Sequence, residues 1–482
     1  MPTLSAKSIG FYRPRQPLES DFHRLVRTYF DDFRAAYADR YARRLGFWRP
    51  VIHKAVRHFL KCGDPHHGFA RVRCPDCRHE FFVAFSCKQR CICPSCAQKR
   101  TLLFGLHVAD DICRPVPHRQ FVWTIPKRLR IFFRFHRDLL NRLPPLAWQT
   151  IREVYSALLG DDAIPGGVLV LQTFGTLIHF HPHLHGLVTD GALAPDGRFL
   201  PLPVNLTHQP FLRLWEQKIF RLLLDEHLIE PALIEQMRCW RHSGFHVDRS
   251  VRIDAGDRDA LQRLAQYMAR SPFSLARLLR ITHDGKVLYK AEKDPCQRYP
   301  KPASADLFPG VARNFQVLDP LDFLAELTQH IPNQGQHPIR YYGCYANKSR
   351  GLAAQQAATE PALAQPPRPA AVRPNTEERR RWAMLIKRIY QTDPLRCPNC
   401  GGTMKFIAFF EDRQTEVIRK ILQHCGLWQD PPARGPPGHT PPSQTVRTLD
   451  ANRILEADPD FLEHTRREAS DQNDQPELPW EP

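Results

Sequence analysis

Alternating histidines are the feature of this sequence whose spacing most directly indicates chemistry. The stretch HFHPHLHGLVTDG places them at His179, His181, His183 and His185. Side chains two residues apart lie on the same face of a β-strand. We therefore expect His183 and His185 to point the same way, with Leu184 facing the core behind them. Two imidazoles on one rigid face can bind a metal ion through their neutral ring nitrogens.

A third ligand for such an ion can come from two places. His181 shares the strand face if the strand is unbroken, but Pro182 can turn it away. Gln172, in the apolar run before the histidines, is the second candidate. We expect strands over residues 167–178 and 183–189, either one long strand broken at Pro182 or two neighbours. The alternative to a metal site is a set of solvated surface histidines.

Cysteine pairs predict a structural zinc site. Cys74 and Cys77 are followed, after fifteen residues, by Cys93 and Cys96. Two Cys-x-x-Cys turns at this spacing are typical of one four-thiolate zinc ion. Cys87 is the substitute ligand if the pairing is different. With four protein ligands and no open position, this site is a folding element that can also touch DNA, and not the catalyst.

A second, weaker cysteine pattern lies near the C-terminus. Cys397 and Cys400 form another Cys-x-x-Cys pair, and His424 and Cys425 could complete a second zinc site.

An exposed tyrosine beside a two-histidine metal site predicts cleavage of single-stranded DNA. The tyrosine attacks a phosphodiester while a divalent ion, Mg²⁺ or Mn²⁺, polarises the phosphate. In DRDALQRLAQYMARSPFSL, Tyr267 lies at the edge of a buried helical stripe. Arg263 and Arg270 share its side of the helix and could bind the scissile phosphate and favour the phenolate. The alternative is a half-buried packing tyrosine.

A competing set of tyrosines follows in HPIRYYGCYANKSRG, at Tyr341, Tyr342 and Tyr345. The neighbouring basic residues are Arg340, Lys348 and Arg350. The glycine and the NKSRG segment favour a strand leading into a loop. We therefore predict DNA binding at Arg340, Tyr342, Lys348 and Arg350, with base stacking on the ring and phosphate contacts to the cations.

Composition favours a polyanionic partner. The 482 residues contain 68 Lys and Arg against 50 Asp and Glu, a formal net charge of +18 that is typical of nucleic-acid binding. The first twenty residues lack the apolar core of a signal peptide, and no apolar run is long enough to span a bilayer. We therefore expect a cytoplasmic protein with no membrane partner, in which the 14 cysteines are thiols or metal ligands.

The order of predicted elements indicates an α+β fold. Residues 21–61 have a helical apolar period, and HEFFVAF is a strand of the zinc ribbon. From residue 118 to about 345, strands and helices mix in a way that predicts an antiparallel or mixed sheet with flanking helices. The predicted domains are a basic helical region (1–60), a zinc-binding domain (61–105), a catalytic domain (106–350), a linker (351–380), a cysteine-containing module (381–430) and a disordered tail (431–482).

Taken together, these motifs resemble those of the IS91 family of HUH-type rolling-circle transposases, including the common-region elements. HUH denotes histidine, hydrophobic residue, histidine, and HPHLHGLVTDG matches it at His183-Leu184-His185. The cysteine region resembles that family's zinc-binding domain, LAQYMARSPFSLARL its tyrosine motif, and RYYGCYANKSRG the end of its catalytic domain. The resemblance covers residues 20–430. It implies a transposase that nicks one strand at an element end, forms a 5′-phosphotyrosine and transfers it.

One position departs from the family's pattern. Some members carry two tyrosines four residues apart in this helix, whereas Arg263 occupies the earlier position here. Only Tyr267 remains, which fits a single-nucleophile variant and puts a two-tyrosine strand-switching scheme in doubt.

Three other function classes fit part of the pattern. A non-catalytic DNA-binding regulator accounts for the zinc ribbon and the charge, but not for the aligned histidines or Tyr267. A plasmid relaxase or replication initiator uses the same chemistry at an origin. A hydrolytic zinc enzyme would need a general base beside the histidines, and no HExxH pattern is present.

Overall fold

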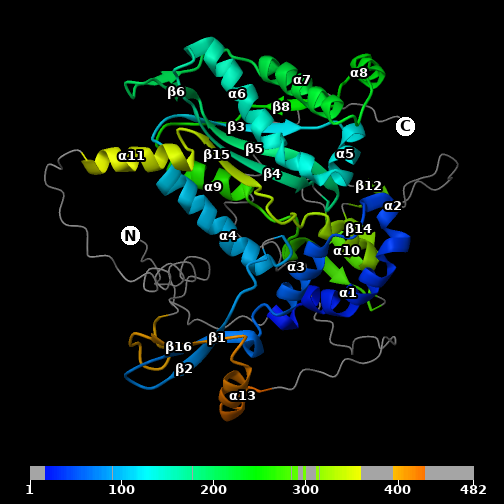
Figure 1. The fold of residues 1–482 in the computed structure, drawn as a ribbon. Helices are drawn as coiled ribbons and strands as arrows, with labels where there is room; N and C mark the ends of the chain where they lie inside the picture. The colour runs from blue at the N-terminus through cyan, green and yellow to red at the C-terminus, as the bar shows by residue number, and fades with distance from the viewer. Residues whose placement is uncertain are drawn as a thin grey trace, which may run out of the picture. The chain divides into compact units, whose positions relative to one another are not determined.

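The computed structural model describes residues 17–89, 91–175, 177–283, 285–290, 297–299, 311–313, 315–359 and 395–428 (Figure 1). Most of the predicted linker and all of the predicted tail lie outside these residues. The described helices and strands form antiparallel sheets flanked by helices, which confirms the α+β prediction. Within the part of the chain that is described, no helix has both the length and the apolar character needed to cross a membrane.

The N-terminal helices pack against a segment that lies far along the chain. They are α1 (Asp21–Arg40), α2 (Ala42–Leu45) and α3 (Pro50–Leu60). Their apolar sides share one core with α10 (Pro320–Thr328) and with the small sheet β10 (Leu278–Ile281), β11 (Val287–Lys290) and β14 (Phe315–Leu318). Phe22 stacks on Phe273 at 4.3 Å between ring centroids. The Tyr41 hydroxyl donates to Asp322 Oδ1 at 2.7 Å.

A three-stranded sheet carries the zinc-binding region and includes the C-terminal module. Its strands are β1 (Gly68–Arg73), β2 (Glu80–Ala84) and β16 (Lys405–Glu411), in the order β16-β1-β2. The helix α13 (Thr415–His424) buries Ile418 and Leu422 with Phe69 of β1. The module predicted at residues 381–430 is therefore not separate where it is described, because its strand completes the sheet of the zinc-binding domain.

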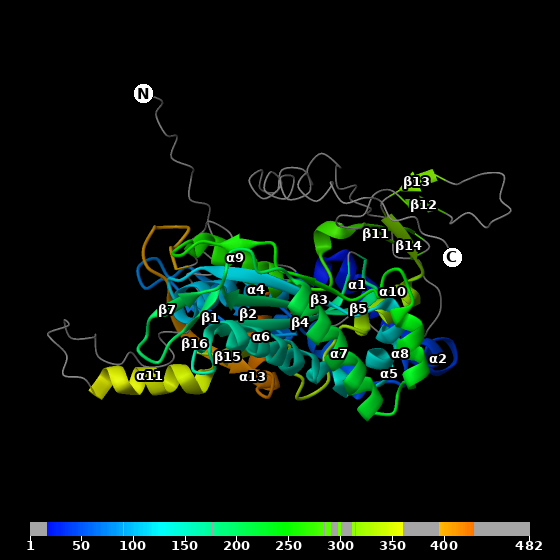
Figure 2. The same cartoon turned by 90° about the horizontal axis from the view of Figure 1, so that it is seen from above.

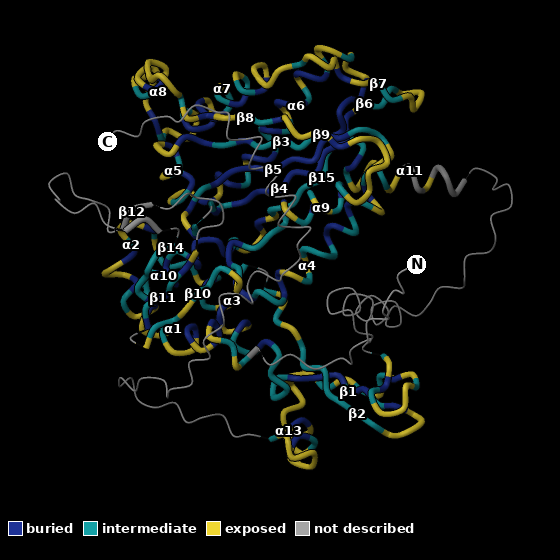
Figure 3. The backbone as a smooth tube through the Cα atoms, turned by 180° about the vertical axis from the view of Figure 1, so that it is seen from behind, coloured by how far each residue is buried: buried dark blue, intermediate teal, exposed yellow. Residues whose placement is uncertain are grey.

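The central sheet positions the histidines. Its order is β15 (Ile339–Gly343), β4 (Gly166–Phe174), β5 (Phe180–Thr189), β3 (His118–Thr124) and β8 (His246–Asp248), and β9 (Arg252–Ile253) also pairs with β3. All of its pairs are antiparallel. Strands β4 and β5 are buried along most of their length, as the dark blue tube in Figure 3 shows.

Helices cover both faces of this sheet. On one face, α6 (Leu143–Leu159) and α7 (Gln209–Asp225) pack on Phe121, Trp123, Leu169 and Leu184. On the other, α4 (Pro94–His107) and α9 (Arg258–Met268) pack on Val168, Val170 and Leu187. Figure 2 shows the strands between these two helical layers. By strand alternation, the face under α4 and α9 is the one that carries His183 and His185.

The remaining described elements connect these parts. They are α5 (Arg130–Phe135), β6 (Gly191–Leu193), β7 (Phe199–Pro201), α8 (Pro231–Arg238), β12 (Gln297–Tyr299), β13 (Val311–Arg313) and α11 (Asn347–Thr359).

The histidine strand is not broken at Pro182. β4 and β5 are two neighbouring strands, and β5 begins at Phe180, earlier than predicted. The ladder with β3 ends at the pair Thr124–His183, and the register with β4 shifts just beyond Gln172. Pro182 therefore lies past the regular ladder, where its missing N–H removes no required hydrogen bond.

Candidate active site and cysteine clusters

His183 and His185 converge on one point. Both side chains are buried, and their Nε2 atoms lie 3.2 Å apart. The Nδ1–H of His183 donates to the carbonyl oxygen of His181 at 2.8 Å, which leaves its Nε2 with a lone pair. Two Nε2 atoms at this distance share either one proton or one cation. The pair predicted from the alternation is thus brought together by the structure.

Burial keeps these imidazoles neutral. It lowers the pKa of His183 to about 4, and it holds the pKa of His185 well below its usual value, with His183 and Arg270 adding to the effect. A neutral imidazole is the form that binds a metal. The pair is therefore ready to accept a cation without first losing a proton.

Gln172 supplies a third inward-facing lone pair. It stands directly opposite His183 in the β4–β5 ladder and is 3% exposed. Its Nε2 donates to the carbonyl oxygens of Met268 at 2.7 Å and Tyr267 at 3.3 Å, which fixes the direction of the amide. Its Oε1 is buried and has no hydrogen-bond partner among the described residues. A buried acceptor without a partner is costly, so a cation at this place would satisfy it.

His181 does not complete a histidine triad. Its ring centroid is 5.1 Å from that of His183, so it lies on the same side of the strand. Among the described residues, however, the three histidines do not form a group whose ligand atoms all lie within 4.8 Å of one another. His181 Nε2, like Gln172 Oε1, is buried and has no hydrogen-bond partner among the described residues, so both remain candidates for a third ligand.

Tyr267 lies against the histidine pair. It is on α9, is 37% exposed, and its ring meets that of His185 edge-on at 5.3 Å between centroids. The guanidinium of Arg270 stands over the Tyr267 ring at 4.5 Å. Arg263, one turn earlier, is exposed on the same helix. A partly exposed phenol, a guanidinium cation and the histidine pair therefore meet on one face of the sheet, over its middle strand.

Helix α4 holds α9 in this position. A Cβ on Gly105 would lie 2.6 Å from Gln266 Cγ and 3.0 Å from the carbonyl oxygen of Gln262, so glycine permits the close approach of the two helices. The Thr101 hydroxyl donates to the carbonyl oxygen of Ala269 at 3.0 Å. The contacts of α4 thus fix the part of α9 that flanks Tyr267.

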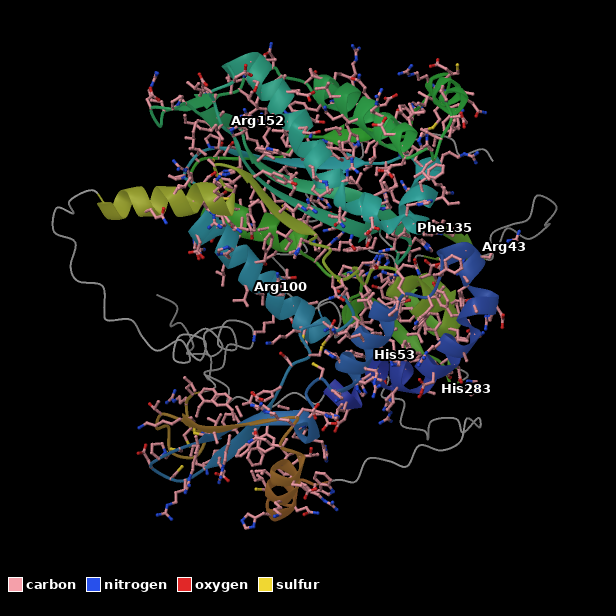
Figure 4. All side chains as sticks on the ribbon, in the orientation of Figure 1. Arg43, His53, Arg100, Phe135, Arg152 and His283 are labelled. Atoms are coloured by element: carbon pink, nitrogen blue, oxygen red, sulfur yellow. The ribbon has the colours of Figure 1, made fainter. Side chains whose placement is uncertain are left out.

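A small basic cavity adjoins Gln172. Its volume is about 80 Å³, and its walls include Arg100, Arg137, Arg270 and the apolar side of β4. Arg100 projects from α4 (Figure 4). Three of the lining residues are arginines, although most of the lining surface is apolar and Arg137 already donates to the carbonyl oxygen of Gln329.

The competing tyrosines occupy other environments. The Tyr342 ring stacks on Trp148 at 5.1 Å, on the sheet face opposite the histidines. Tyr345 is buried, and its hydroxyl is bonded to His118 Nε2 at 2.7 Å. Tyr341 pairs with Val168, four residues along β4 from Gln172. The structure therefore does not bring these tyrosines to the histidine pair.

The basic residues predicted to bind DNA in residues 340–350 differ in exposure and in their contacts. Arg350 stands over the Tyr341 ring at 5.7 Å, and its Nε donates to the carbonyl oxygen of Tyr345. Lys348 is exposed at the start of α11, and Arg340 is half-buried on β15. Lys348 is the member of the set most open to a phosphate.

The cysteines form two clusters, and the predicted grouping is wrong. The structure does not bring Cys74, Cys77, Cys93 and Cys96 together. One cluster is Cys62, Cys87, Cys93 and Cys96, and the other is Cys74, Cys77, Cys397 and Cys400. The turn at 74–77 lies at the end of β1, where β16 brings the second Cys-x-x-Cys turn beside it. The turn at 93–96 opens α4 instead, and its thiols meet the end of α3.

Both clusters have the dimensions of a tetrahedral zinc site. With Zn–S bonds of about 2.3 Å, the sulfurs lie about 3.8 Å apart. In the first cluster the Cys62–Cys93 and Cys87–Cys96 Sγ distances are both 3.6 Å, and Cys62–Cys96 is 4.0 Å. Hydrogen bonding from the neighbouring thiols holds the pKa of Cys96 below its usual range. The residues therefore fit zinc.

The prediction that His424 and Cys425 complete a second zinc site is also wrong. Both residues are exposed at the end of α13, and neither belongs to a cluster among the described residues. Cys397 and Cys400 take Cys74 and Cys77 as partners instead.

Sequence reasoning missed Cys62 as a ligand and named Cys87 only as a substitute. The backbone after each pair distinguishes the two kinds of cysteine turn. Arg78 and Gly401 follow Cys77 and Cys400 and both adopt positive φ, of 63° and 75°, which ends a compact turn. After Cys96 the chain continues as a helix, so that pair belongs to a different kind of site.

Known proteins match both the region of the histidine strand and the N-terminal cysteine region of this chain. A family model described as "Putative transposase" matches residues 166–351, and one described as "Transposase zinc-binding domain" matches residues 29–125. The transposase for insertion sequence element IS801 of Pseudomonas savastanoi pv. phaseolicola is 26% identical, over 75% of this chain and 85% of that protein. "Putative transposase y4qJ" of Sinorhizobium fredii (strain NBRC 101917 / NGR234) is 24% identical, over 70% and 84%. No solved structure matches the chain.

Proposed function

Because this chain belongs to the IS91 family of transposases with an N-terminal zinc-binding domain, we propose that it cuts and rejoins single-stranded DNA at the ends of its element. The nucleophile is Tyr267, the linkage is a 5′-phosphotyrosine, and the element moves by rolling-circle transposition. The observation that carries this proposal is the meeting of Tyr267 with the convergent pair His183 and His185.

The chemistry follows from what these residues can do. The Tyr267 oxygen forms a bond to the scissile phosphorus while the bond from phosphorus to the 3′-oxygen breaks. The phenolic proton is lost to solvent and the departing oxygen takes one up, so the products are a 3′-hydroxyl and a phosphotyrosine. Attack by a 3′-hydroxyl of the target strand reverses the step and releases Tyr267. The bond energy is retained throughout, and no hydrolysis is needed.

A divalent cation would bind between three side chains. Nε2 of His183, Nε2 of His185 and Oε1 of Gln172 would hold Mg²⁺ or Mn²⁺, which would polarise the scissile phosphate. The anchoring of Gln172 to the backbone of residues 267 and 268 also ties this ligand to the helix of the nucleophile. Ligand and nucleophile are thus held at a fixed separation.

Arg270 and Arg100 would contribute by binding the negatively charged phosphates of the DNA. Arg270 stands over the Tyr267 ring, where its positive charge attracts the phosphate that approaches the tyrosine. The cavity beside Gln172, with Arg100 and Arg270 in its wall, suits a phosphate of the strand next to the scissile one. Because Arg263 is not a nucleophile, each chain forms one phosphotyrosine at a time.

The test is covalent capture of the cut strand. The protein is incubated with labelled single-stranded DNA from the flanks of its own gene and Mn²⁺, and the adduct is mapped by mass spectrometry. We expect the nucleotide on the peptide that contains Tyr267. Tyr267→Phe keeps the ring against His185 and should abolish the adduct, while Tyr341→Phe, on the same sheet face, should retain it. An adduct within residues 341–345 would show that the assignment is wrong.

A further inference from the structure

We propose that Cys74, Cys77, Cys397 and Cys400 bind a second Zn²⁺ ion, separate from the one at Cys62, Cys87, Cys93 and Cys96. This ion joins the C-terminal segment to the N-terminal zinc-binding domain. The match to the transposase zinc-binding domain ends at residue 125, so it accounts for neither Cys397 nor Cys400. The inference does not depend on the cleavage chemistry proposed above.

The four thiols have zinc-site geometry although they come from distant parts of the chain. The Cys74–Cys400 and Cys77–Cys397 Sγ distances are 3.5 and 3.4 Å, close to the edge of about 3.8 Å expected for tetrahedral zinc thiolate. The sulfurs of Cys74 and Cys397 belong to buried residues, whereas Cys77 and Cys400 are exposed. One side of the site faces the core and the other faces solvent, so an ion can enter without unfolding the sheet.

The two Cys-x-x-Cys turns are backbone copies of each other. In the first, the Cys74 N–H donates to the oxygen of His79 at 2.8 Å, and the Arg78 N–H to the oxygen of Cys74 at 3.1 Å. In the second, the Cys397 N–H donates to the oxygen of Gly402 at 2.8 Å, and the Gly401 N–H to the oxygen of Cys397 at 3.0 Å. Two turns with the same bonds, facing each other with four thiols between them, form one complete ligand set.

The turns also contact each other directly. A Cβ on Gly402 would meet the carboxylate of Asp76 in the opposite turn, so the two turns lie in close contact there. Asn399 Nδ2 donates to His79 Nδ1 at 3.4 Å across the same junction. These contacts set the spacing of the sulfurs independently of any ion.

The strands behind the turns make the C-terminal segment part of the domain. β16 pairs with β1 from Gly68–Glu411 to Arg73–Lys405. Val72, Cys74, Cys397 and Met404 form one buried cluster, to which each segment contributes two residues. Neither segment can bury its own apolar face alone, and each supplies only half of the ligands. Because metal binding and folding are coupled in such small modules, loss of either half should abolish the site.

The ion closes a long loop of chain. Cys74 and Cys400 are 326 positions apart, and the whole catalytic sheet lies between them. Closing a long loop costs conformational entropy that grows slowly with its length, and a zinc ion bound by four thiolates can offset it. This second zinc site is therefore completed only after the last of its cysteine pairs, Cys397 and Cys400, has been made.

The first experiment counts zinc in the full-length protein by native mass spectrometry. We expect two ions per chain in the unaltered protein and one in Cys397→Ser/Cys400→Ser. The control His424→Ala/Cys425→Ser, next in the chain but outside the cluster, should keep both. Two ions in the Cys397→Ser/Cys400→Ser variant, or a single ion in the unaltered protein, would overturn the proposal.

A second experiment tests the joining role without any cysteine change. A protease site is introduced between residues 360 and 394, a range outside the described residues, and the folded protein is cut there. We expect the two fragments to elute together and to separate when a strong zinc chelator is added, with the release of one ion preceding separation. Fragments that separate before chelation, or that remain together after both ions are removed, would show that zinc does not join them.

Discussion

Gly105 is the position where one methyl group tests whether α4 holds the catalytic helix in place. In Gly105→Ala the new Cβ would lie 2.6 Å from Gln266 Cγ and 3.0 Å from a backbone oxygen of α9. Overpacking of this kind costs about 1–3 kcal/mol, while alanine in a helix gains up to about 1 kcal/mol over glycine. We expect a net loss of about 0–3 kcal/mol in the free energy of unfolding, and a shift of α9.

The effect on DNA cleavage should exceed the effect on stability. Tyr267 follows Gln266 directly, and a displacement of about 1 Å at a reacting group can lower the rate by about 100-fold. The assays are thermal unfolding and the rate of adduct formation on single-stranded DNA. The matched control is Gly351→Ala on α11, where a Cβ would meet no atom within 4 Å. If Gly105→Ala cleaves at the unaltered rate and is as stable as this control, α4 does not position the nucleophile.

Three further predictions concern the site. Replacing His183 and His185 with Ala should abolish cleavage and Mn²⁺ binding but leave DNA binding nearly intact, because phosphate contacts come from Lys and Arg. Calorimetry measures the Mn²⁺ affinity and filter binding the DNA affinity, and full cleavage by this variant would refute the assignment. Gln172→Glu should retain or tighten Mn²⁺ binding whereas Gln172→Met should weaken it, and equal affinities would remove this residue from the ligand set. Tyr345→Phe loses the hydroxyl bonded to His118, so we expect a loss of about 1–3 kcal/mol in the free energy of unfolding and an unchanged DNA adduct. An unchanged melting temperature together with a lost adduct would contradict a packing role for Tyr345.

Local periodicity in the sequence was sufficient to predict which side chains of the candidate site share a face. Alternation over His183 and His185 required a shared strand face, and the helical period around Tyr267 placed it at the rim of a buried stripe. Both inferences depend only on the repeat of one element, which the backbone geometry fixes. The α+β class followed in the same way from the order of these repeats.

The position of Gln172 beside the histidine pair depends on the register of two strands. From the sequence, His181 was the predicted third ligand and Gln172 the alternative. The ladder sets Gln172 opposite His183, and His181 lies at the start of β5, where the register with β4 shifts. Register depends on pairing between strands, which no pattern within one strand specifies.

The grouping of the cysteines also depends on pairing between segments, which here lie much farther apart in the chain. Each Cys-x-x-Cys turn was evident from the sequence, because the turn is local. Which turns share an ion depended on the pairing of β16 with β1 across more than three hundred residues, and on the end of α3 reaching the start of α4. A metal site is a contact in space, so spacing in the chain identifies its ligands, but only the packing of distant segments decides which of them meet.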